Sequence, residues 1–156
     1  MHEPPWETYS EAAVRELFCG DDDAIRFMQD IGFWSHVYDD LIDRDKDIPA
    51  DFIHAVMWKL MVSIPENPFY QRHQSYLRPI IVTGILNWRA ANDMEASGSV
   101  EQLRVAHVTR YSINDVALMV MELVGGHEHA VRHAARARLM FQRDTWAHYL
   151  SEHRHV

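Results

Sequence analysis

The chain has 156 residues, of which 47% are hydrophobic and 24% charged, so we expect one compact domain spanning residues 1–156. Its longest apolar run is too short to cross a membrane and its acidic start is unlike a secretory signal, which predicts a cytoplasmic protein without a membrane partner. Residues 1–51 carry 14 acidic and four basic residues of a chain whose net charge is −8. Such a surface repels phosphate backbones, so we expect no direct nucleic-acid partner.

Helical periodicity recurs along the chain, and glycine and proline number only six each. These features predict an all-α protein, a single bundle of about five helices. In chain order, the predicted helices cover residues 24–43, 50–62, 68–95, 100–124 and 127–153. We expect Pro79 to kink the third helix or to start a second segment, Gly125 and Gly126 to end the fourth, and residues 1–10 to form a loose arm.

The most informative segment lies near the end of the first predicted helix. At 100° per residue, one arc of about 100° holds four polar side chains, namely His36, Asp39, Asp40 and Asp43. The arc borders an apolar stripe formed by Phe33, Trp34, Val37 and Leu41. Like charges at this spacing repel, and a divalent cation would reverse that penalty. The alternative is an ordinary solvated acidic face.

The fourth predicted helix contains Asp115 and Glu122 in a stretch that is apolar nearly all round. Their directions differ by about 20°, and they flank Leu118 and Met119 on one face. We expect this helix to be central and both carboxylates to point into the core, where they need a metal ion or a cationic partner. The alternative is a buried ion pair with Arg104 or with an arginine of the last helix.

Two of these segments resemble the metal-binding motifs of class I isoprenoid (terpenoid) synthases. Asp39-Asp40-Leu-Ile-Asp43 matches DDxxD in full, and Asn114-Asp115-(x)6-Glu122 is similar to NDxxSxxxE, with Leu118 at the serine position. The resemblance implies a terpenoid-synthase-like bundle in miniature, whose two motifs face each other and hold Mg²⁺ (or Mn²⁺) to ionise a substrate diphosphate. The predicted metal residues are Asp39, Asp40, Asp43, Asn114, Asp115 and Glu122.

Substrate contacts are expected mainly from the third predicted helix. Trp88, Asn92 and Glu95 fall on one line of that helix, and Arg72, Arg78 and Arg89 are candidates for a diphosphate clamp because guanidinium suits phosphate oxygens. An apolar wall is predicted from the aromatic residues Trp34, Tyr38, Trp88 and Tyr111.

A separate metal site is a further possibility, since His129 and His133 stand four residues apart. With His36 they resemble the three-histidine bundles of the DinB type. The alternative is a histidine run at a helix start, which also includes His127.

Together these patterns predict a Mg²⁺-dependent enzyme that acts on a small phosphorylated molecule by ionisation, transfer or hydrolysis of a diphosphate. One alternative is an all-α nucleotide pyrophosphohydrolase. The other is a non-catalytic helical interaction protein, with homo-oligomers left open, whose acidic face binds a basic partner. Metal between the predicted carboxylates favours an enzyme, and arginine side chains among them favour the interaction protein.

Overall fold

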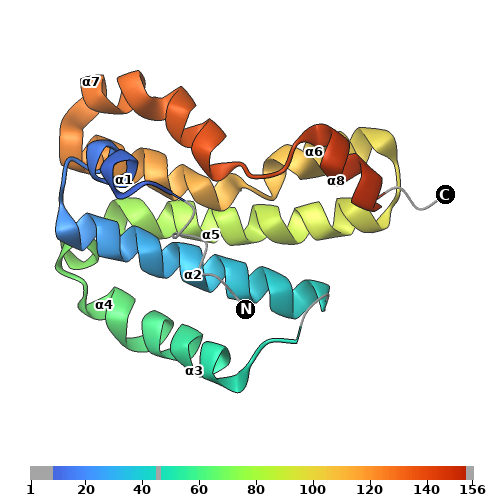
Figure 1. Cartoon of the computed structure of the whole chain (residues 1–156), viewed down its shortest axis with the longest axis horizontal. Helices are drawn as coiled ribbons and strands as arrows, with labels where there is room; N and C mark the ends of the chain where they lie inside the picture. Colours follow the sequence, from blue (N-terminus) through green and yellow to red (C-terminus); the bar gives the residue numbers. More distant parts are fainter. Residues whose placement is uncertain (1–8, 45–46, 154–156) are drawn as a thin grey trace. The chain divides into compact units, whose positions relative to one another are not determined.

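The computed structural model describes residues 9–44 and 47–153, and within them it contains helices and loops but no strand (Figure 1). The predicted all-α class is confirmed. The elements are α1 (Glu11–Leu17), α2 (Asp22–Asp43), α3 (Ala50–Trp58), a π-helical turn (Lys59–Ser63), α4 (Ile64–Glu66), α5 (Pro68–Ala96), α6 (Val100–Thr109), a 3-10 turn (Ser112–Asn114), α7 (Asp115–Phe141) and α8 (Trp146–His153). None of the helices described is both long and apolar enough to span a bilayer.

Backbone contacts divide the chain into two compact units. The first unit runs up to Gln74 and includes Leu123–Gly126, and the second contains Ser75–Glu122 and the chain from His127 onward. In the first unit, the Phe27 ring packs on Phe69 and stacks on Tyr70 at a centroid distance of 5.5 Å. In the second, a buried cluster joins α5, α6 and α8 through Ala91, Leu103, Ala106 and Tyr149. Each unit therefore has apolar packing of its own.

The ends of α2 follow the sequence closely. Asp21 caps its first turn, with Oδ1 accepting from the Ala24 amide at 2.9 Å, and Arg44 ends it in the left-handed conformation at φ 56°. The short helix α1 was not predicted, although Ser10 caps it through the Ala13 amide. Most of the predicted N-terminal arm, residues 1–8, lies outside the described residues.

The second predicted helix extends further than expected. After α3 the backbone continues through the π-helical turn into α4, so the predicted end at Val62 is wrong. Pro65 is accommodated because it lies in the first turn of α4, where a missing N–H costs little. Asn67 then ends the segment, its side chain donating to the Asp23 carbonyl and accepting from the Tyr70 amide.

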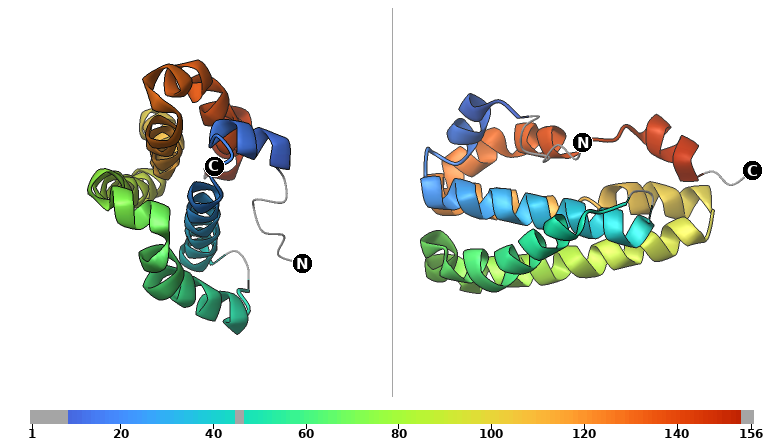
Figure 2. Two further views of the ribbon diagram at one scale, coloured as in Figure 1. Left: turned by 90° about the vertical axis from the view of Figure 1, so that its left-hand side faces the viewer. Right: turned by 60° about the horizontal axis from the view of Figure 1, so that its bottom comes forward.

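The third predicted helix is confirmed as α5, which continues through Pro79 without starting a second segment (Figure 2). The predicted break at Gly125 and Gly126 is present, because Gly126 is non-helical, but the fourth and fifth predictions need correction elsewhere. The backbone leaves α-helical geometry between α6 and α7, and α7 bends at Gly126, where φ is 77° and ψ 178°. The last predicted helix ends at Phe141, and α8 follows separately. Asp144 fixes the loop between them, because its carbonyl accepts from His107 Nε2–H at 3.0 Å.

Candidate functional site

A groove in the second unit contains two of the predicted metal residues. The bend at Gly126 divides α7 into two limbs, residues 115–122 and 127–141 (Figure 1). Contacts from Asp115 to Arg138 and from Glu122 to His127 place the limbs antiparallel. Together with α5 they enclose a groove of about 590 Å³. Its lining is Pro79, Ile80, Thr83 and Gly84 of α5, Asp115, Leu118, Met119 and Glu122 of the first limb, and His127, Ala130, Val131 and Ala134 of the second.

The predicted face of α7 is present, but its predicted burial is wrong. Asp115, Leu118, Met119 and Glu122 all line the groove, as their shared direction requires. The side chains of Asp115 and Glu122 are nevertheless 40% and 42% exposed. The opposite face of the same limb is the buried one, and it consists of Val116, Ala117, Val120 and Met121. An apolar helix therefore lies half in the core and half in an open groove.

Each groove carboxylate faces a cationic or titratable side chain of the second limb. Arg138 donates to Asp115 Oδ1, and His127 Nδ1 lies 3.6 Å from Glu122 Oε2. The predicted metal residue Asn114 instead donates its amide to the Phe141 carbonyl at 3.1 Å. An arginine of the last predicted helix thus occupies the place in which the sequence predicts a metal ion or an ion pair.

The acidic segment of α2 is divided between core and surface. Asp40 is buried, with His36 Nε2 3.5 Å from its carboxylate. Asp43 is exposed and Asp39 is half-buried. Leu41, expected in the apolar stripe, is 38% exposed, whereas Val37 is fully buried. The stripe prediction is therefore wrong at Leu41, because the buried face of α2 turns toward Asp40 near the end of the helix.

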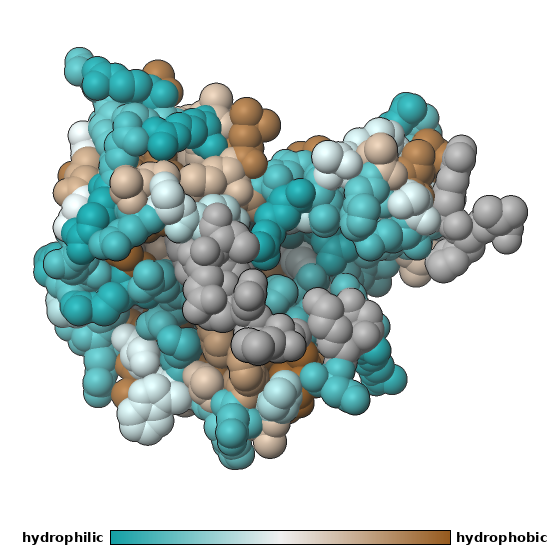
Figure 3. Space-filling view, viewed as in Figure 1, coloured by the Kyte–Doolittle hydropathy of each residue, from teal (hydrophilic) through white to brown (hydrophobic). Residues whose placement is uncertain are grey.

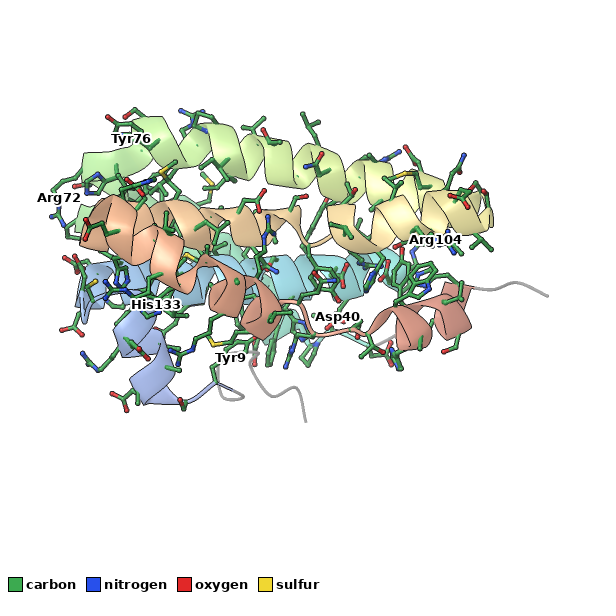
Figure 4. The ribbon with its side chains drawn as sticks, turned by 90° about the horizontal axis from the view of Figure 1, so that it is seen from above. Tyr9, Asp40, Arg72, Tyr76, Arg104 and His133 are labelled. Atoms are coloured by element: carbon green, nitrogen blue, oxygen red, sulfur yellow. The ribbon has the colours of Figure 1, made fainter. Side chains whose placement is uncertain are left out.

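The predicted substrate residues all lie on α5, which both units share. Arg72, Arg78 and Arg89 are exposed (Figure 4 labels Arg72), and Arg89 pairs with Asp93 one turn away. Arg72 belongs to the first unit, while Arg78 and Arg89 belong to the second. Trp88 and Asn92 are half-buried, and the Asn92 Oδ1 atom is buried without a hydrogen-bond partner. Of the predicted aromatic wall, Trp34 and Tyr38 stack at 6.0 Å within the first unit.

Glu95 has partners that sequence reasoning missed. Its carboxylate accepts from Arg110 at 2.7 Å and from the Tyr149 hydroxyl at 2.5 Å. The Glu95 and Arg110 side chains are only 10% and 11% exposed. Burial, followed by the bond to Glu95, raises the pKa of Tyr149 above its ordinary value, and burial with a bond to Asp144 does the same for Tyr111. This network of hydrogen bonds joins α8 to α5 and to the end of α6. The only sequence signal for this network was that Glu95 falls on one line of the helix with Trp88 and Asn92.

Two of the three histidines of the possible metal site lie close together. The rings of His129 and His133 are 4.6 Å apart on the second limb of α7, where Figure 4 labels His133. His36 belongs to the first unit. Among residues 9–44 and 47–153, no three or more His, Cys, Asp and Glu side chains form a group that could hold a metal ion. The three-histidine site stays a prediction.

An exposed apolar surface lies in the first unit. Ile53, Met57, Trp58 and Met61 are 40%, 54%, 64% and 69% exposed, and their spacing places them on one side of α3 and the π-helical turn. We name these four residues the α3 face. Lys59 turns the other way, pairing with Asp30 at 2.5 Å and lying over the Phe33 ring. Brown, hydrophobic atoms are visible in Figure 3 in the region of α2 and α3.

Comparison with protein-family models, with curated proteins and with solved structures gave no match to this chain. The resemblance to terpenoid synthases stays a prediction.

Proposed function

We propose that the protein is a non-catalytic helical interaction protein that binds a basic amphipathic helix through the α3 face. The observation that carries this proposal is the exposure of Ile53, Met57, Trp58 and Met61 side by side on one helical surface. Contiguous exposed apolar side chains mark interaction sites, and methionine-rich surfaces adapt to helical partners. Covering each of these side chains adds about 1 kcal/mol of favourable transfer free energy.

The charge around the α3 face selects the partner. Residues 39–51 contain six aspartates against one arginine and one lysine. Asp47, just before α3, and Asp51, in its first turn, are exposed. A helix with lysine or arginine beside its apolar stripe meets complementary charge, whereas an acidic helix is repelled. The acidic character of residues 1–51 also opposes pairing of this face with a second copy of itself.

A pair of designed peptides tests the proposal. One is an amphipathic helix of about five turns with leucine on one side and lysine on the other, and its counterpart has glutamate for every lysine. We expect the lysine peptide alone to bind, and Trp58→Ser to weaken binding at least about tenfold, the equivalent of about 1.4 kcal/mol. The matched control is Leu86→Ser, since Leu86 of α5 is also 64% exposed and lies off the α3 face.

Three outcomes would contradict the proposal: equal binding of both peptides, equal weakening by both substitutions, or a concentration-dependent dimer that Trp58→Ser dissociates. The magnesium-dependent diphosphate enzyme stays a prediction with its own test. Mg²⁺ with pyrophosphate should raise the melting temperature if the α2 carboxylates hold metal, and Asp43→Asn should abolish the rise.

A further inference from the structure

The groove of the second unit offers a binding site that is separate from the α3 face. Its walls are the apolar parts of α5 and of the two α7 limbs, and the small side chains of Ala130 and Ala134 leave it open. A volume of about 590 Å³ falls within the range of sites for small organic molecules, about 300–1,000 Å³. Val131, on its edge, is 64% exposed. A bound hydrocarbon would remove this surface from water.

The two carboxylates of the groove are compensated unequally. Arg138, whose charge is permanent, donates a hydrogen bond to Asp115. Glu122 faces His127 at 3.6 Å, a separation beyond that of a good hydrogen bond, and the imidazole is a cation only when protonated. The groove therefore keeps negative charge at the Glu122 end, beside Leu118 and Met119. Apolar surroundings strengthen the attraction of such a carboxylate for a cation.

We propose that this groove binds a compact hydrophobic molecule carrying one protonated amine. The ammonium group lies at Glu122, and the hydrocarbon lies along Leu118, Met119 and Val131. An anionic ligand is disfavoured at this end by repulsion from Glu122, and a neutral one gains only the apolar contacts. The groove belongs to a different unit from the α3 face, so a negative result for one proposal does not contradict the other.

Three probes of equal chain length separate charge from hydrophobicity: n-octylammonium, n-octanol and octanoate, titrated by calorimetry at neutral pH and low salt. We expect octylammonium to bind about fivefold more tightly than octanol, the size of a half-exposed ion pair, and octanoate to bind least. In Glu122→Gln, the affinity for octylammonium should fall to that for octanol, while octanol binding is unchanged.

Two further variants test whether the probes bind in this groove. Glu128→Gln removes an exposed carboxylate of the second limb that does not line the groove, and it should leave all three affinities unchanged. Ala130→Leu fills the groove and should weaken all probes that bind. The proposal is overturned if no probe binds at millimolar concentration, if octanoate binds most tightly, or if Glu122→Gln and Glu128→Gln have the same effect.

Discussion

Two carboxylate–arginine pairs of the second unit have the same chemistry in opposite surroundings. Glu95 and Arg110 are 10% and 11% exposed, and Glu95 also accepts from Tyr149. Asp115 and Arg138 are 40% and 41% exposed. The charges of the buried pair are compensated only by protein groups, whereas water can solvate either charge of the groove pair. The difference indicates that the α5–α6–α8 network contributes to the stability of the fold and that the groove charges are accessible to water.

Breaking the buried pair should have the largest effect. Glu95→Gln removes the carboxylate that pairs with the buried Arg110 guanidinium, and we expect a loss of about 3–5 kcal/mol in the free energy of unfolding, measured in denaturant. The control is Glu101→Gln, which removes an 83%-exposed partner of Arg104 and should change the free energy by less than about 0.5 kcal/mol. Equal effects of the two substitutions would remove the contrast between buried and exposed pairs.

Tyr149 gives the same network a pH dependence. Its pKa is raised in the folded protein, so the folded state holds the phenolic proton more tightly than the unfolded state does. The resulting stabilisation is complete below the unfolded-state pKa of about 10 and is lost as the pH rises toward the folded-state value. Tyr149→Phe should cost about 1–2 kcal/mol at neutral pH through the lost hydrogen bond.

Melting temperatures measured from neutral to strongly alkaline pH provide the test. The wild-type protein should lose more stability above about pH 10 than Tyr149→Phe does. Tyr76→Phe serves as the control, because Tyr76 is 58% exposed. An alkaline loss that is the same in the wild type and in Tyr149→Phe would show that Tyr149 does not couple to folding.

Local signals predicted the helices well where one residue fixes an end. The Asp21 cap and the Gly126 bend are examples, since each acts on its own turn. The break between α6 and α7 depends on tertiary contacts instead. Asn114 bonds to the Phe141 carbonyl and Tyr111 to Asp144, and neither contact can be read from the residues around position 112.

The sequence predicted which helix face carries the carboxylates of the candidate site, but not how deeply that face is buried. Helical periodicity placed Asp115 and Glu122 on one face, and both line the groove. Burial depends on what packs against that face. The residues of the first limb do not determine that the second limb folds back and leaves a groove beside them. For the same reason Asp40, expected at a margin, is buried. The arginine that meets Asp115 stands 23 residues away, beyond the reach of any local pattern.

Asp115→Asn should have the smallest effect. If Asp115 were buried with Arg138, the substitution would cost as much as Glu95→Gln, and if it were a metal ligand, stability without metal would be unchanged or raised. At 40% exposure, water solvates the released guanidinium, so we expect a loss below about 1 kcal/mol. A double-mutant cycle with Arg138→Met isolates the pair energy from other effects of each substitution. A coupling free energy as large as the loss of stability in Glu95→Gln would indicate that Asp115 is buried and would contradict an open groove. A small coupling free energy that disappears at high salt supports an ion pair that a ligand can displace.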